Sequence, residues 1–128
     1  MNNKKGFHTA LAHLFYALIK VDQRIDVHEK KQIVAIVEQQ QIDTFETQDD
    51  KEYFYAMLRT LIKDNKNIED AYIIFKNYVI ANRDIFTKER SNRVIKGAHK
   101  ICASFANKNK SELILLARIH KLLLPNEA

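Results

Sequence analysis

Glycine and proline are almost absent from this chain, and that scarcity constrains its fold more than any other feature. The 128 residues include only two glycines and one proline, and no Asn-Gly or Asp-Gly pair occurs. Tight hairpins between strands depend on such pairs, whereas glycine and proline are the residues that most disfavour helices. The sequence therefore predicts an all-α protein, and its length suits a single domain over residues 1–128.

Apolar residues recur at helical spacing in six segments that are separated by short polar connections. The first predicted helix runs from Lys5 to Val21 and the fifth from Lys88 to about Ala106. One apolar face is expected on the first helix: Phe7, Leu11, Leu14, Phe15, Leu18 and Ile19. The expected apolar set of the last helix is Leu113, Leu116, Ala117, Leu123 and Leu124. Because the connections are short, consecutive helices should pack as neighbours in one compact bundle.

Residues suited to capping stand where five of these helices should begin. Their side-chain oxygens can accept a hydrogen bond from a backbone N–H that has no partner within the helix. The predicted N-caps are Asp26, Thr47, Asn67, Thr87 and Ser111.

Two helix–loop–helix units lie near the two ends of the chain. The loop of the first contains Asp22, Ile25, Asp26 and Glu29, and the second, degenerate copy retains an acid at Glu112. This motif resembles that of the TerB-like family, which is named for tellurite resistance. The resemblance implies a compact all-helical bundle with pseudo-twofold related helix pairs. It also implies a non-catalytic binding or adaptor role, linked to stress response or tellurite resistance, with an unidentified protein partner.

The resemblance further implies a weak divalent metal site in these acidic loops, formed by Asp22, Asp26, Glu29 and Glu112. Oxygen-only ligands of this kind favour Ca²⁺ or Mg²⁺. A purely structural role for these acids is the alternative. Asp26 and Glu29 have the spacing of a capping box, in which both side chains accept hydrogen bonds from backbone amides at the start of a helix. Gln23 replaces the family glycine, and Lys108 and Lys110 add positive charge to the second loop.

Positive charge collects in the last third of the chain. Nine Lys/Arg and three Asp/Glu between Lys88 and Ala128 give +6, against −1 for the preceding residues and +5 overall. Arg93, Lys96 and Lys100 share one face of the fifth helix, and Arg90 flanks them. This face is either a phosphate-binding surface for nucleic acid or an anionic membrane, or simply a solvated helix face.

No catalytic motif stands out, and we predict that the protein is not an enzyme. None of the five histidines forms a His-Glu-x-x-His zinc motif, and we expect them at surface or boundary positions. Cys102, the single cysteine, lies on the apolar face of the fifth helix, which predicts a buried packing residue.

The sequence favours a cytoplasmic location. A lone cysteine cannot form an internal disulfide, and the apolar stretch from Ala10 to Ile19 is interrupted by His13, unlike a signal peptide. No apolar run approaches the roughly 20 residues of a membrane-spanning helix.

Overall fold

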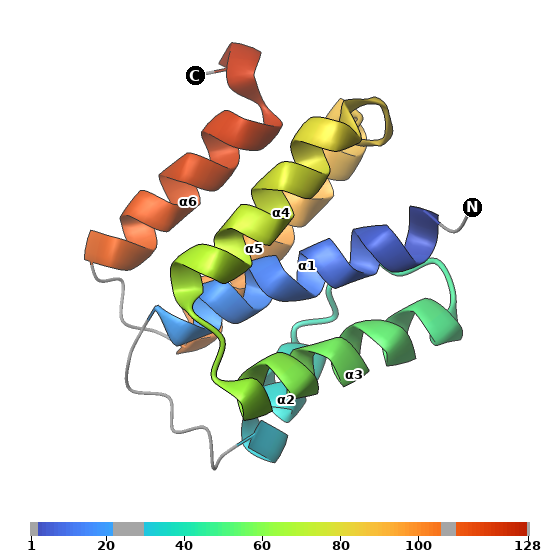
Figure 1. Ribbon diagram of the computed structural model, residues 1–128, viewed down its shortest axis with the longest axis vertical. Coiled ribbons are helices and arrows are strands. Elements are labelled where there is room, and N and C mark those ends of the chain that lie inside the picture. The colour runs from blue at the N-terminus through green and yellow to red at the C-terminus, as the bar shows by residue number, and fades with distance from the viewer. Residues whose placement is uncertain (1–2, 22–29, 106–109, 128) are drawn as a thin grey trace.

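The computed structural model describes residues 3–21, 30–105 and 110–127, and within these ranges it contains helices and no strand (Figure 1). The all-α prediction is thus confirmed. None of the described helices is long and apolar enough to cross a membrane. The helices are α1 (Asn3–Lys20), α2 (Lys30–Gln39), α3 (Gln48–Asp64), α4 (Ile68–Ala81), α5 (Lys88–Phe105) and α6 (Lys110–Leu123), with short 3₁₀ turns η2 (Arg83–Ile85) and η3 (Pro125–Glu127).

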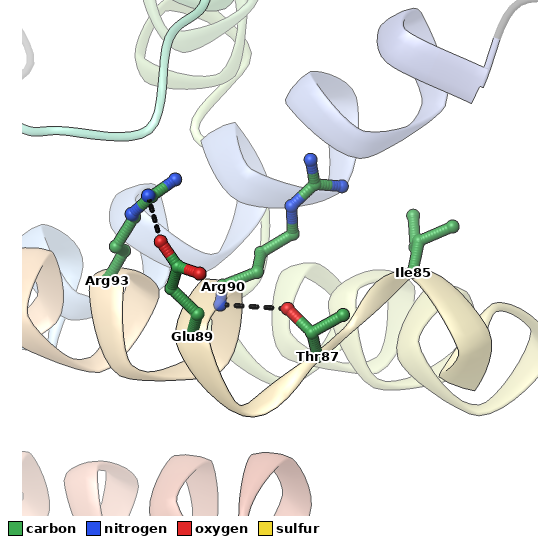
Figure 2. Close-up of a pocket in the computed structure, with 5 residues that line it drawn as sticks. All are labelled: Ile85, Thr87, Glu89, Arg90 and Arg93. Atoms are coloured by element: carbon green, nitrogen blue, oxygen red, sulfur yellow. Dashed lines mark hydrogen bonds and ion pairs between the residues drawn. The ribbon is translucent and has the colours of Figure 1, made fainter.

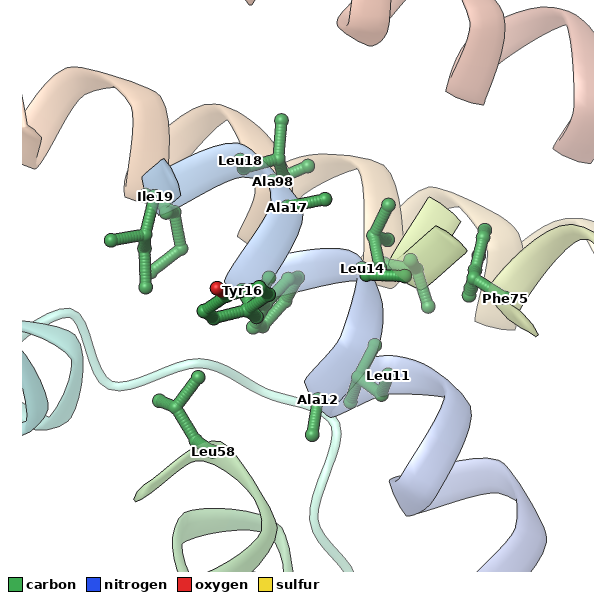
Figure 3. Packing of buried hydrophobic residues seen from close by; sticks show 14 of the residues in the cluster. Leu11, Ala12, Leu14, Tyr16, Ala17, Leu18, Ile19, Leu58, Phe75 and Ala98 are labelled. Atoms are coloured by element: carbon green, nitrogen blue, oxygen red, sulfur yellow. The ribbon is translucent and has the colours of Figure 1, made fainter. Parts of the chain in front are cut away.

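Helix α1 is the central element of the bundle, and α3, α4 and α5 all pack against it. Every side chain from Ala10 to Ile19 is buried, and Figure 3 shows several of them, such as Leu11, Leu14 and Leu18, among Leu58 of α3, Phe75 of α4 and Ala98 of α5. All six residues of the predicted apolar face are buried, but burial also extends to the other side of the helix. Small residues on the other face, such as Ala12 and Ala17, let neighbouring helices cover that side as well.

Three of the predicted N-caps are confirmed. The side-chain oxygens of Thr47, Asn67 and Thr87 accept hydrogen bonds at 3.0, 3.1 and 3.1 Å from the amides three residues later. Ser111 is not a cap, because Lys110 is already helical and Ser111 lies in the first turn of α6. Asp26 lies outside the described residues.

The buried face of α6 differs from the predicted one. Leu116 and Leu123 are buried as expected, but Leu113 and Ala117 are exposed. The residues that complete the buried face are Glu112, Leu115 and Ile119. Among the described elements, α6 packs mainly against α4, α5 and η3, so one side of it is buried. The continuous apolar run around Leu113 left it ambiguous from the sequence which side that would be.

Candidate functional site

Arg90, one of the predicted phosphate contacts, lies in the first turn of α5 and reaches toward α1 (Figure 2). Its guanidinium carbon lies 4.9 Å from the centre of the Phe7 ring, a cation–π distance. It also forms a 3.5 Å ion pair with Glu46, and 33% of its side chain remains exposed. Arg90 is thus fixed in position while part of its cationic surface remains open to solvent.

The other predicted cations lie along the same helix but do not form a uniformly available stripe. Arg93 is bound to Glu89 one turn earlier at 2.5 Å, and Lys100 donates a hydrogen bond to the Gln40 carbonyl at 3.3 Å. Lys96 is exposed. Intramolecular contacts therefore already engage three of the four predicted phosphate-binding side chains.

Two depressions meet at Arg90. The outer one is lined by Ile85, Thr87, Glu89, Arg90 and Arg93 (Figure 2). The inner one has a volume of about 110 Å³ and is lined by Phe7, His8, Thr44, Glu46, Asp50, Ile85 and Arg90. Because Arg90 and Ile85 border both, a ligand in the outer depression can approach the polar groups of the inner one.

The inner cavity holds buried polar atoms. The Thr44 hydroxyl and one oxygen of the Asp50 carboxylate are buried and have no hydrogen-bond partner among the described residues. Buried polar atoms are normally hydrogen-bonded. A donor and an acceptor held in this way beside a guanidinium indicate a site that takes a water or a small polar group.

Two histidines are more deeply buried than the sequence predicted. His8 and His13 were expected at surface or boundary positions, but both are buried, with 4% and 6% exposure. His8 stacks on Phe45 at a centroid distance of 5.7 Å. The Nδ1 atom of His13 lies 2.7 Å from the Thr9 carbonyl, and burial lowers the pKa of its imidazole. Both histidines lie on α1, which neighbouring helices cover on more than one side.

The predicted metal ligands Asp22, Asp26 and Glu29 lie outside the described residues. Glu112 is described, and it is 1% exposed in the interface between α5 and α6 rather than in an open loop. Among the residues that the structure describes, no three His, Cys, Asp or Glu side chains are grouped to hold a metal ion. The acidic metal site therefore remains a prediction.

Cys102 is buried, with 3% exposure, as predicted. Burial and the nearby negative charge of Glu112 raise the pKa of its thiol to about 12. Since the thiolate is the reactive form, this cysteine is a packing residue and not a nucleophile at neutral pH.

The comparisons with known proteins add no relative. No protein-family model, no curated protein and no solved structure matches the chain. The resemblance to TerB-like domains therefore stays a prediction that rests on the loop motif.

Proposed function

We propose that the protein is a non-catalytic binding or adaptor domain of the TerB-like kind, and that it engages an acidic group of a protein partner at Arg90. The observation that carries this proposal is the state of Arg90 itself. Its guanidinium is held over Phe7, one-third of its side chain is exposed, and its ion pair with Glu46 among the described residues is long, at 3.5 Å. A partner carboxylate can replace Glu46 and accept two parallel hydrogen bonds from the planar guanidinium.

The start of α5 favours an anionic ligand, whereas the carboxylates of Glu46, Asp50 and Glu89 that line the two depressions oppose one. Arg90 lies in the first turn of α5, where the helix dipole creates positive potential. The Thr44 hydroxyl in the adjoining cavity offers a donor for a second oxygen of the incoming group.

An NMR titration with a short Asp- and Glu-rich peptide tests this proposal. In ¹H–¹⁵N spectra, we expect saturable shifts of the Arg90 side-chain Nε–H and of the first amides of α5. Arg90→Gln should abolish these shifts. Lys96→Gln, which removes an exposed charge further along the same helix, should keep them. Equal binding by the Arg90→Gln variant would exclude Arg90 as the recognition residue.

The resemblance extends the proposal to a cytoplasmic role in stress response or tellurite resistance, tuned by Ca²⁺ or Mg²⁺ at Asp22, Asp26, Glu29 and Glu112. An ion present at 100 times its Kd should add about 2.7 kcal/mol to the free energy of unfolding. Thermal unfolding with each ion, against a chelator, measures this. The added stability should disappear in Asp22→Ala. If neither ion stabilises the native chain, the acidic residues of the loop act only as helix caps.

The alternative function is phosphate binding by the basic face of α5. Exposed Lys96 and the +6 charge of residues 88–128 favour it, while the internal contacts of Arg93 and Lys100 weaken it. It predicts binding to duplex DNA, RNA or anionic vesicles that weakens steeply with salt. The variant Lys96→Glu/Lys100→Glu should lose such binding but retain the response to the acidic peptide, which separates the two functions.

A further inference from the structure

Two histidines on neighbouring helices, one on α5 and one on α6, lie in contact with each other. His99 belongs to α5 and His120 to the last turn of α6, and both are exposed. Their Nε2 atoms are 3.1 Å apart. The ring centroids are 5.3 Å apart and the ring planes are inclined at 68°. The two rings therefore direct their Nε2 edges toward each other.

We propose that His99 and His120 form a two-histidine site for a divalent transition-metal ion such as Zn²⁺, Cu²⁺ or Ni²⁺. Neutral imidazole nitrogen is a preferred ligand of these ions, whereas Ca²⁺ and Mg²⁺ require oxygen. Without metal, one Nε2 donates its proton to the other. With metal, both Nε2 lone pairs point to the ion and each ring carries its proton on Nδ1.

The distance between the two nitrogens fits such an ion. Ligands at about 2.0–2.1 Å from a tetrahedral zinc are about 3.4 Å apart, and in a square-planar site they are about 2.9 Å apart. The observed 3.1 Å lies between these values. For both lone pairs to meet at one tetrahedral ion, each ring must turn by about 35° from this head-to-head arrangement. Because both side chains are exposed, water can fill the remaining positions.

A metal ion at this site would fasten α6 to the bundle. Helix α6 packs against α4 and α5, and an ion pair of Arg118 with Glu69, with nitrogen–oxygen distances of 2.8 and 3.1 Å, already ties it to α4. The two histidines come from different helices, so the ion would bind the docked arrangement and not the separated one. Neighbouring Lys96, Lys100 and Lys121 add positive charge, which predicts modest affinity.

Calorimetric titration of the full chain with Zn²⁺ alone tests the proposal. We expect one ion bound per chain, and at least a tenfold loss of affinity in each of His99→Gln and His120→Gln. Both side chains are exposed, so these variants should fold, which far-ultraviolet circular dichroism checks. Lys121→Gln, next to His120 in the sequence, is the matched control and should bind Zn²⁺ at least as tightly as the native chain.

A second measurement does not depend on variants. Sub-stoichiometric Cu²⁺ is paramagnetic and should broaden the NMR signals of residues around His99 and His120 first. Unchanged Zn²⁺ affinity in either glutamine variant would overturn the proposal. So would broadening centred on residues 22–29 or on the buried His8 and His13, or the absence of saturable Zn²⁺ binding by the native chain.

Discussion

The ring of Phe15 lies directly against Gly97, so that a Cβ added to Gly97 would lie 3.0 Å from the ring's Cζ atom. The same Cβ would lie 3.3 Å from the Cγ2 atom of Ile42. Phe15 and Ile42 are both buried, with 0% and 7% exposure. The missing side chain at Gly97 is therefore what lets α5 approach the central helix this closely.

Gly97→Ala should destabilise the fold by about 1 kcal/mol. Alanine improves helix propensity by about 1 kcal/mol, but overpacking a dense core costs roughly 1–3 kcal/mol, and buried neighbours cannot move aside. Urea unfolding measures the difference. In a Phe15→Leu background the ring is gone, so the same substitution should cost less or stabilise. A net gain from Gly97→Ala alone would show that the interface has room.

Thr47→Ala should cost about 1 kcal/mol of stability, because Thr47 accepts the Asp50 amide at 3.0 Å and caps α3. Thr60 is the matched control. It is exposed in the middle of the same helix and bonds only to the Ala56 carbonyl, so Thr60→Ala should be neutral or slightly stabilising. Equal effects of the two substitutions on the urea midpoint would contradict a capping role.

Tyr16 should make the fold sensitive to alkali. Its hydroxyl donates to the Lys66 carbonyl at 2.7 Å, and burial raises the pKa of Tyr16 to about 12 from 10.0. The folded-state pKa is the higher one, so the stabilisation is complete below pH 10 and is lost as pH rises through about 12. Burial raises the pKa of Tyr55, Tyr72 and Tyr78 as well, with the same sign.

Tyr16→Phe provides the check. At neutral pH it should lose about 1 kcal/mol, the value of one hydrogen bond. Between pH 10 and 12 its free energy of unfolding should fall less steeply than that of the native protein, by up to about 1.4 kcal/mol per pH unit. Urea unfolding at a series of pH values measures both. Parallel pH profiles would mean that Tyr16 ionises equally in the folded and unfolded chain.

Cys102 should react with a thiol reagent only when α5 and α6 separate. At pH 8 a thiol whose pKa is about 12 is almost entirely protonated, and the side chain is buried. We therefore expect labelling at least 100-fold slower than in the urea-unfolded chain. Labelling should speed up as urea approaches the unfolding midpoint. Native-state labelling at the unfolded rate would show that the interface is open.

The sequence was informative where a pattern was local. Thr47, Asn67 and Thr87 were found as caps because a cap acts within three residues of itself. The burial of Cys102 was predicted correctly because the apolar residues of this helix follow one helical period. Positions set by packing were harder to predict. The phase of α6 depends on which side meets α5, and the burial of His8 and His13 depends on how many helices surround α1.

The candidate site could likewise be predicted only where the signal was local in the sequence. Arg90 was identified because it flanks a basic helix face, but the residues that contact it were not. Phe7, Glu46 and Asp50 come from the N-terminal helix and from the region where α3 begins, far from Arg90 in sequence. Nothing local in those residues indicates the meeting point. Only the tertiary fold brings an aromatic ring, a carboxylate and a guanidinium together there.

The central position of α1 has a consequence for biosynthesis. The stretch Ala10–Ile19 leaves the ribosome before the helices that bury it. Since α5 completes its cover, most of the chain must be synthesised while this apolar segment remains accessible. A nascent chain of this protein should therefore be a chaperone client until α5 has emerged, and ribosome-bound chains that end before Lys88 should remain sensitive to proteases.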